Sequence, residues 1–359
     1  MSGTSLDGID VAYLETDGEA IVKCGTSATY AYSPAQQELL SQALVAAKEI
    51  TQRHLLTPQL AQAAQALTQW HIEAVESFSQ THGLSPSNTD VIGFHGQTVL
   101  HRPENRLTVQ LGDGQALANA TKIPVVYDMR AADIAAGGQG APLVPIYHAA
   151  LAPTKPCAFV NIGGVGNVTF IGSTGELLAF DTGPGNALLN DWMMKHQGKA
   201  FDEGGSVSLK GQVSRPHLSL AMAHHYFKQA PPKSLDRNSF ANVRFDSLTL
   251  EDGAATLTAF TAESIAAAMQ WFPEKPKLWV ICGGGRHNAA MMKHLQALLP
   301  NITSSDALGL NGDALEAEAW AYLAVRSLKG LPLTYPSTTG VAQPMTGGVL
   351  ARPVVAPSS

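Results

Sequence analysis

Hydrophobic and polar residues follow two different periods in the first third of the chain. Residues 11–16, VAYLET, alternate with a period of two and include β-favouring side chains, which predicts a strand. A capping residue followed by proline, at Ser33 and again at Thr57, begins two segments whose apolar residues recur every three or four positions, which predicts helices. Short apolar runs at 90–96 and 123–128 predict further strands. Strands that alternate with helices of this length indicate an α/β fold with a mixed or parallel sheet.

The same patterns return after a proline-punctuated stretch at 142–156, where a second unit begins. The expected strands are 157–162, 168–172, 176–181 and the start of 277–288, and the expected helices are 186–197, 257–272 and 313–329. Residues 201–255 are expected to be irregular, and the tail from Leu331 to lie over the surface. Both halves share a hairpin with a glycine-rich turn followed by helices, a plan compatible with internal duplication. We therefore predict two domains: 1–130, joined by part of the C-terminal tail, and 131–359.

Composition narrows the class of protein. The chain has 359 residues, of which 45% are apolar and 14% charged, so it can bury large cores. A net charge of −6 argues against a nucleic-acid partner, which would need a basic surface. No apolar run is long enough to span a membrane, and no secretory signal is visible. Three widely spaced cysteines, Cys24, Cys157 and Cys282, suggest buried thiols in a reducing compartment, so we expect a cytoplasmic protein without a membrane partner.

Four glycine-rich turns lie next to predicted strands: Gly3–Gly8, Gly163–Asn167, Gly183–Asn186 and Gly283–Asn288. Glycine lets the backbone turn sharply and brings its N–H groups close to a ligand, and the start of a following helix favours an anion. A structural turn explains any one of them, but four, each beside a hydroxyl or amide side chain, predict a nucleotide site.

The nucleotide motifs of other folds are missing. The sequence contains neither the Gly-x4-Gly-Lys-Ser/Thr loop nor a Gly-x-Gly-x-x-Gly motif that opens a helix after a first strand. Two glycine hairpins in two domains point instead to a two-domain actin-like (ribonuclease H-like) ATPase fold of the α/β class. In that fold the active site lies in the interdomain cleft, and backbone amides and Mg²⁺ hold the phosphates.

Asp181 ends a predicted strand and precedes Thr-Gly-Pro-Gly-Asn. A carboxylate at this position can act as a general base or hold the water of a metal ion, whereas an isolated Asp-Thr-Gly commonly makes a turn with its own backbone. The polar cluster of segment 93–103 suits sugar recognition or is ordinary loop polarity. Arg130 can bind a substrate carboxylate or pair with Asp128, and Glu316 by itself fits an exposed helix position. The residues alone leave these alternatives open.

Two other kinds of site find no support. The histidines form no His-Glu-x-x-His motif, and no Gly-x-Ser-x-Gly elbow accompanies a serine nucleophile. We therefore set zinc and serine-hydrolase chemistry aside.

Seven segments resemble, in order, the motifs of the anhydro-N-acetylmuramic acid kinases. They are MSGTSLDGID, FHGQTVLHRP, DMRAADIAAGGQGAPLVP, FVNIGGVGNVTFI, FDTGPGNALLNDW, CGGGRHN and DALEAEAWAYLAVR. The resemblance extends from Met1 to about Gly347, and the family belongs to the hexokinase, actin and Hsp70 fold superfamily. It implies an ATP- and Mg²⁺-dependent kinase of peptidoglycan recycling. This enzyme opens the anhydro bond of 1,6-anhydro-N-acetylmuramic acid with water and phosphorylates O6, giving N-acetylmuramic acid 6-phosphate and ADP.

The resemblance also implies roles for residues. Asp181 matches the general base for the attacking water. Residues that match the ATP-binding turns are Gly3, Thr4, Ser5, Leu6, Asp7, Gly8, Ile9, Asp10, Gly163, Gly164, Gly166, Asn167, Gly283, Gly284 and Gly285. Residues that match the sugar pocket more loosely are Gln97, Thr98, Arg130 and Glu316. No direct protein ligand is assigned to the metal, and a homodimer is expected.

The N-terminus departs from the family pattern. Members carry several residues before the first motif, which form a strand entering the turn, and Met1 stands where that strand should end. We expect the entering strand to lie outside the given sequence. Two other functions remain open: a general sugar kinase of the same fold that acts on a free hydroxyl, and a nucleotide-dependent binding or regulatory module.

Overall fold

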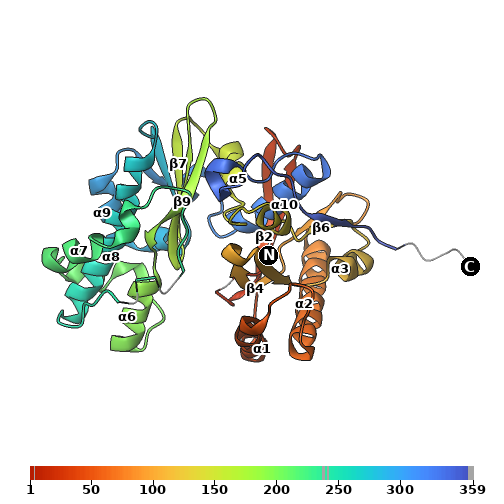
Figure 1. Cartoon of the computed structure of the whole chain (residues 1–359), viewed down its shortest axis with the longest axis horizontal. Helices are drawn as coiled ribbons and strands as arrows, with labels where there is room; N and C mark the ends of the chain where they lie inside the picture. Colours follow the sequence, from red (N-terminus) through yellow and green to blue (C-terminus); the bar gives the residue numbers. More distant parts are fainter. Residues whose placement is uncertain (4, 237–238, 241, 355–359) are drawn as a thin grey trace, which may run out of the picture. The chain divides into compact units, whose positions relative to one another are not determined.

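The structure, a computed structural model, describes residues 1–3, 5–236, 239–240 and 242–354. The chain divides into two compact units, Met1–Ala150 with Ala314–Ser359 and Leu151–Asp313. Each unit combines helices with β-sheet, so the predicted α/β class is confirmed (Figure 1).

The boundaries of the units differ from the predicted division at residue 130. Met129 and Leu143 share one hydrophobic core with Trp320 and Leu323 of helix α10 (Leu315–Leu328). This shared core places both the segment after residue 130 and the last long helix in unit 1.

Unit 1 has three groups of strands. β1 (Gly8–Thr16) and β2 (Val22–Ala31) form an antiparallel hairpin, as do β4 (Gln97–Arg102) and β5 (Leu107–Leu111). A three-stranded sheet has the order β12 (Val349–Ala351), β6 (Val125–Tyr127), β3 (Ile92–Phe94). β12 runs antiparallel to β6, so the tail does not simply lie over the surface as predicted but completes a sheet.

The helices of unit 1 follow their predicted start signals. Ser33 caps α1 with a capping box, Thr57 caps α2, and Gly83 ends α2 at a φ of 67°. The helices of this unit are α1 (Pro34–Ala46), α2 (Pro58–His82), α3 (Gly114–Thr121), α4 (Ala131–Ala135), α5 (Pro145–Leu151), α10 and α11 (Pro336–Thr339).

The first two residues pair with β1. Ser2 forms an antiparallel bridge with Ile9, and Met1 and Asp10 exchange two backbone hydrogen bonds of 2.8 Å. Beyond them, a cavity of about 310 Å³ lies between β1 and β3 and is lined by their residues, by Met1 and by His71 of α2. Met1 and Ser2 therefore lie alongside the first residues of β1.

Unit 2 is built on one five-stranded sheet with the order β11-β10-β7-β8-β9. β7, β8 and β9 are antiparallel neighbours, and β10 runs parallel to both β7 and β11. The strands are β7 (Cys157–Ile162), β8 (Val165–Ile171), β9 (Leu177–Pro184), β10 (Leu278–Cys282) and β11 (Ile302–Ser304). The sequence predicted all of these except β11.

The helices of unit 2 are α6 (Ala187–Gln197), α7 (Arg215–Met222), α8 (Leu250–Ala267) and α9 (Ala289–Leu298). The prediction that 201–255 is irregular is wrong in two places, because α7 lies within it and α8 begins seven residues before the predicted 257. Gly253 obscured the start of α8. A Cβ at Gly253 would overlap the ring of Trp192, so packing between helices α6 and α8 selects the glycine.

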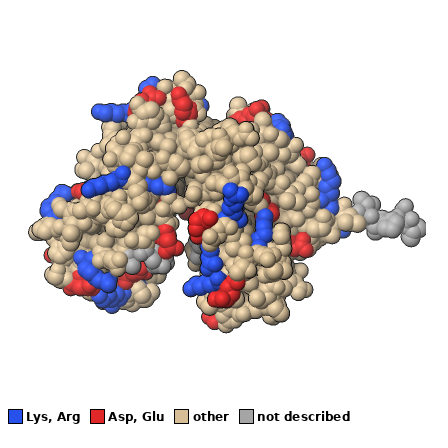
Figure 2. All heavy atoms as spheres, in the orientation of Figure 1, with Lys and Arg blue, Asp and Glu red and all other residues tan. Residues whose placement is uncertain are grey.

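Three further properties concern the cysteines, the helices as membrane spans and the surface charge. Cys157 and Cys282 are buried as predicted, but Cys24 is exposed, because most of β2 faces solvent. Among the described residues, every helix is too short or too polar to cross a lipid bilayer. On the face drawn in Figure 2, acidic and basic side chains are interspersed rather than gathered into one patch.

Candidate functional site

The glycine turn before β1 is held by hydrogen bonds between its own residues. The Leu6 N–H donates to the carbonyl of Gly3 at 3.3 Å, and the Ser5 hydroxyl donates to Asp7 Oδ1 at 2.7 Å. Leu6 has a φ of 56°, which marks a tight turn. Thr4, which belongs to the predicted phosphate loop, lies outside the described residues.

The last three residues of the predicted loop belong to β1. A Cβ at Gly8 would lie 2.6 Å from the carbonyl oxygen of Tyr30, so glycine is needed for the pairing of β1 with β2. The Ile9 side chain is buried in the core, which leaves only its backbone for a ligand. Asp10 is half-buried, and its Oδ1 accepts a hydrogen bond from Thr29 at 2.6 Å.

Three of the residues predicted to bind the sugar meet in unit 1. Gln97 is fully buried, and its Oε1 accepts a hydrogen bond of 2.5 Å from the hydroxyl of Ser2, directly before the predicted phosphate loop. Thr98 Oγ1 and Arg130 Nη2 approach the same atom, His95 Nε2, at 3.4 and 3.3 Å.

Glu316, in the first turn of α10, is the fourth predicted sugar residue. Its charge is attracted by Arg130 and by the amino group of Met1, and it is repelled by Asp10 and Asp7. The structure therefore brings Glu316 into the same charged neighbourhood as the phosphate loop and Arg130.

His95 links Ser2, Thr98 and Arg130 through its two ring nitrogens. In the sequence, only its place in the polar segment 93–103 pointed to a role for it. Its Nδ1 lies 3.1 Å from the carbonyl oxygen of Ser2, which can only accept, so Nδ1 carries the proton and Nε2 accepts from Arg130. Burial, reinforced by the charge of Arg130, lowers the pKa of His95 well below its usual value, which keeps the ring neutral.

Arg130 does not pair with Asp128, and that alternative is wrong because Asp128 forms its ion pair with Arg53 at 2.5 Å. Arg130 donates from Nη1 to the carbonyl of Gly140 at 2.8 Å, while its buried Nε has no hydrogen-bond partner among the described residues. Burial lowers the pKa of Arg130 to about 10, so it remains a cation at neutral pH. A buried cation with a free donor is suited to an anionic ligand.

In unit 2, Gly163 and Gly164 form the turn between β7 and β8. A Cβ at Gly164 would meet nothing closer than Ala187 Cβ at 3.9 Å, and one at Gly163 nothing closer than 3.7 Å. Their amide N–H groups make no hydrogen bond to the described residues, although their carbonyls accept from the segment that leads into α6. Packing does not require glycine at either position, so this face of the turn is open to a ligand.

The other residues of the second hairpin have structural constraints. A Cβ at Gly166 would lie 2.9 Å from Thr182 Oγ1, a buried hydroxyl without a partner among the described residues. Asn167 lies opposite Asp181 across β8 and β9, directly after a register shift at Gly166. The second hairpin and the predicted base are therefore neighbours in one sheet.

The third turn lies beside the end of β7, because β10 runs parallel to that strand. A Cβ at Gly283 would overlap Asn161, and one at Gly285 would overlap a side chain of β7, so both glycines are fixed by packing. Gly284 is open: a Cβ there would meet only Asn186 Nδ2, at 3.9 Å. Gly163, Gly164 and Gly284 are thus the predicted unit 2 glycines whose Cβ positions are free.

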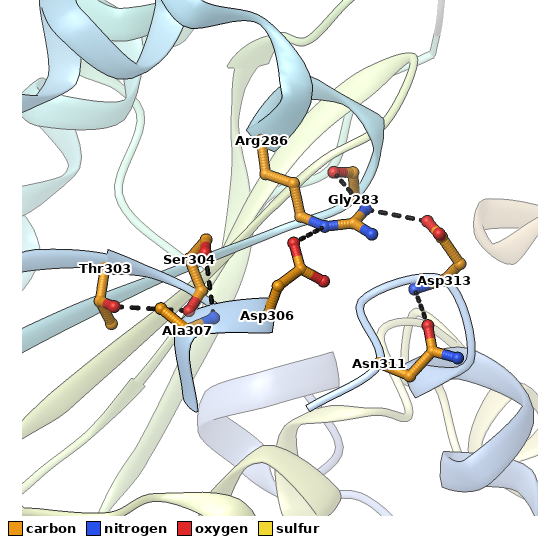
Figure 3. A network of polar contacts seen from close by, with 8 residues as sticks. All are labelled: Gly283, Arg286, Thr303, Ser304, Asp306, Ala307, Asn311 and Asp313. Carbon is orange, nitrogen blue, oxygen red and sulfur yellow. Dashed lines mark hydrogen bonds and ion pairs between the residues drawn. The ribbon is translucent and has the colours of Figure 1, made fainter. Parts of the chain in front are cut away.

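Arg286 holds the third turn in place (Figure 3). Its buried guanidinium donates from Nη1 to the carbonyl of Gly283 at 3.0 Å and to Asp313 Oδ1 at 2.8 Å, and from Nε to Asp306 Oδ2 at 2.8 Å. These bonds hold the pKa of both carboxyls below the usual range. Arg286 lies within the CGGGRHN segment, but no role for it was predicted from the sequence.

Asp181 lies within β9, not at its end, because β9 continues to Pro184. Its Oδ2 accepts a hydrogen bond of 2.7 Å from the N–H of Leu235. Burial raises the pKa of Asp181 to about 7, although the Leu235 bond acts in the opposite direction. A carboxyl group with this pKa can accept a proton at neutral pH, which is the property of a general base.

Comparison with known proteins identifies the family of the chain. The model of the family described as "Anhydro-N-acetylmuramic acid kinase" matches residues 1–353. Curated relatives with that name include one from Rhodopseudomonas palustris strain CGA009, 53% identical, and one from Bradyrhizobium diazoefficiens, 50% identical. Each alignment covers 98% of this chain and 98% of the relative. Among solved structures, a ROK hexokinase from Thermus thermophilus has a TM-score of 0.35 at 15% identity, covering 89% of this chain and 100% of its own; that likeness is too distant to support a conclusion.

A glycine hairpin with open amides beside a carboxyl group of raised pKa is the kind of site that a phosphotransferase needs. The chain belongs to the anhydro-N-acetylmuramic acid kinase family, on a family match over most of its length and relatives at about half identity. It is an enzyme, a kinase, and family membership implies that it uses ATP.

Proposed function

We propose that the chain converts 1,6-anhydro-N-acetylmuramic acid, ATP and water to N-acetylmuramic acid 6-phosphate and ADP. The observation that carries this proposal is the position of Asp181, whose carboxyl pKa is raised to about 7 in the strand that pairs with the open glycine hairpin. The family name of the relatives supplies the substrate. A cytoplasmic homodimer in peptidoglycan recycling is the setting that we propose for it.

The reaction proceeds through one chain of bond changes. Asp181 takes a proton from water while the water oxygen attacks the anomeric carbon of the sugar. The bond between that carbon and O6 breaks, and its electron pair passes to O6. O6 then attacks the γ-phosphorus, and the bond from that phosphorus to the bridging oxygen of ADP breaks. No free hydroxyl is needed in the substrate, because opening the ring creates the nucleophile.

The sugar is held by residues of unit 1. Arg130 carries a buried positive charge and an Nε donor without a partner among the described residues, so we assign it to the carboxylate that an N-acetylmuramic acid carries. Gln97, Thr98 and Glu316 supply amide, hydroxyl and carboxylate groups for the hydroxyls and the acetamido group. His95 stays neutral and keeps Arg130 oriented.

The phosphates of ATP are held by backbone amides. The free N–H groups of Gly163 and Gly164 and the turn at Gly3–Gly8 are the donors that we assign to them. Gly284 leaves space on the nucleoside side.

Mg²⁺, when bound, neutralises charge on the phosphates during transfer. In the described part of the chain, no three His, Cys, Asp or Glu side chains are arranged to hold a metal ion. Nucleotide-bound Mg²⁺ needs only one or two carboxylates, with phosphate oxygens and waters as its other ligands. The exposed Asp7 and the half-buried Asp10 fit that requirement through water.

The test is ADP release with purified protein, ATP and Mg²⁺. We expect turnover with the anhydro sugar and none with N-acetylmuramic acid or N-acetylglucosamine. Faster turnover on a sugar with a free 6-hydroxyl would favour the general sugar kinase. Tight ATP binding without sugar-dependent turnover would favour a regulatory nucleotide-binding module.

A further inference from the structure

One segment of unit 2 outside the predicted motifs makes three hydrogen bonds to Asp181. The Leu235 N–H donates to its Oδ2 at 2.7 Å, and the Tyr226 hydroxyl donates to its main-chain carbonyl at 2.5 Å. In return, the N–H of Asp181 donates to the carbonyl of Lys233 at 3.1 Å. The side chain and both backbone groups of Asp181 are therefore bound by residues 226–235.

The side chain of Lys233 fixes this segment. Its Nζ donates to the carbonyl of Tyr226 at 3.1 Å and lies 4.4 Å from the ring centroid of the same residue. The rings of Trp271 and Phe180 are also near, at 5.5 and 5.6 Å. A cation surrounded by aromatic faces is well anchored. Because Phe180 precedes Asp181 in β9, Lys233 ties the segment to the strand that carries the carboxylate.

We propose that residues 233–235 are a positioning clamp for the general base, in which the Leu235 amide holds Oδ2 and leaves Oδ1 to take the proton from water. This inference rests on the proposed function, since it assigns Asp181 the role of base. No hydrogen bond from a described residue reaches Oδ1. A carboxylate held by one oxygen presents the other in a fixed direction, which favours in-line attack by the water.

The clamp also influences the proton affinity of Asp181. Tyr226 and Lys233 are the ionisable residues that share hydrogen bonds with Asp181 in the described part of the chain. Tyr226 donates to the main chain and not to the carboxylate, and Lys233 points its charge into the aromatic rings. Burial raises the pKa of Asp181, and the Leu235 amide is the group that lowers it. Loss of that amide should therefore raise the pKa further and leave less of the base ionised at neutral pH.

The test compares Leu235→Pro, which lacks the N–H, with Leu235→Ala, which keeps it. The readout is the dependence of kcat on pH with the anhydro sugar and ATP. We expect the acid limb of Leu235→Pro to lie about one pH unit higher than that of Leu235→Ala, and kcat at pH 7 to fall about fivefold because the ionised fraction of a base with a pKa near 7 falls by that factor. The KM for ATP should be unchanged in both variants. An acid limb at the same pH in the two folded variants would overturn the clamp.

Proline can also disturb the local backbone, so two milder variants supply a second measurement. Tyr226→Phe removes one hydroxyl, and Lys233→Met keeps the aliphatic stem while removing the charge. Both variants should lower kcat and move the acid limb of the kcat profile to higher pH without changing the KM for ATP. Acid limbs at the wild-type pH in both variants would overturn the proposal. Asp181→Asn separates the two hypotheses: an active Asp181→Asn enzyme refutes the base itself, whereas an inactive one with an unaffected Leu235→Pro refutes only the clamp.

Discussion

Arg130 Nη2 donates to His95 Nε2 at 3.3 Å, while the opposite nitrogen of the same ring donates to the carbonyl of Ser2. A neutral histidine thus connects the predicted sugar-binding arginine to the residue that precedes the phosphate loop. The contact explains why a strongly lowered pKa at His95 is useful, since a protonated ring could not accept from Arg130.

Substitution of Arg130 tests this relationship. Arg130→Lys keeps a positive charge but loses the planar guanidinium. That group donates to Gly140 and His95, and its Nε has no partner among the described residues. We expect the KM for the anhydro sugar to rise about tenfold or more, with little change in the KM for ATP, measured by steady-state ADP release. A parallel rise in both KM values would contradict a role specific to the sugar.

Gly164 and Gly185 of unit 2 allow a matched comparison of two alanine substitutions. Gly164→Ala adds a methyl group into open space, so the protein should keep its melting temperature while the KM for ATP rises about tenfold. Gly185→Ala serves as the control, because its Cβ would overlap the backbone at Gly163 and should cost about 2 kcal/mol or more of stability. Unchanged ATP kinetics in Gly164→Ala would remove the glycine turn from the phosphate site.

His71 gives a prediction about pH and stability. It is buried, its Nε2 has no partner among the described residues, and burial lowers its pKa to about 3. Below about pH 6.5 the unfolded chain binds a proton at His71 that the folded chain does not, so this residue makes the free energy of unfolding fall as pH falls.

The measurement is urea unfolding between pH 7 and 5 for the wild type and for His71→Phe, which cannot titrate. The wild type should lose up to about 1.4 kcal/mol more per pH unit than the variant at the acid end of this range. Parallel stability curves for the two proteins would show that His71 is protonated in the folded state.

The cavity between β1 and β3 gives a further prediction. A strand that continues the Met1–Asp10 pairing would run antiparallel to β1 and extend into the space of about 310 Å³ that β1 and β3 line. It would also convert the amino group of Met1, whose pKa is lowered to about 6 by burial, into an uncharged amide.

Six residues of alternating valine and threonine added before Met1 should therefore raise the melting temperature by several degrees, roughly what 1–2 kcal/mol gives in a chain of this size. The matched control is a glycine-serine extension of equal length, measured by thermal unfolding. Equal melting temperatures for both extensions would show that the cavity does not accept a strand.

Elements with local signals were predictable from the sequence. Ser33, Thr57 and Gly83 fix the ends of two helices through their own capping groups, and the hairpin of β7 and β8 was predictable from the apolar runs on either side of its turn. The start of α8 was missed because a glycine such as Gly253 usually indicates a break in a helix. In the structure, the contact with the Trp192 ring explains the glycine.

The motifs that we assign to the candidate site were visible in the sequence, but the residues that bind Asp181 were not. Tyr226 and Leu235 lie in a stretch without periodicity, and only tertiary packing brings them to Asp181. Sequence also could not separate the open Gly164 from Gly166, whose added Cβ would meet a hydroxyl of the next strand.

The role of Asp181 as the general base is best tested by comparing the wild type with Asp181→Asn, following ring opening and phosphorylation of the anhydro sugar in one reaction mixture. We expect the variant to bind ATP with nearly wild-type affinity and to lose both products, with kcat reduced at least about a thousandfold. Ring opening or phosphorylation by Asp181→Asn at a rate close to wild type would show that Asp181 is not the base.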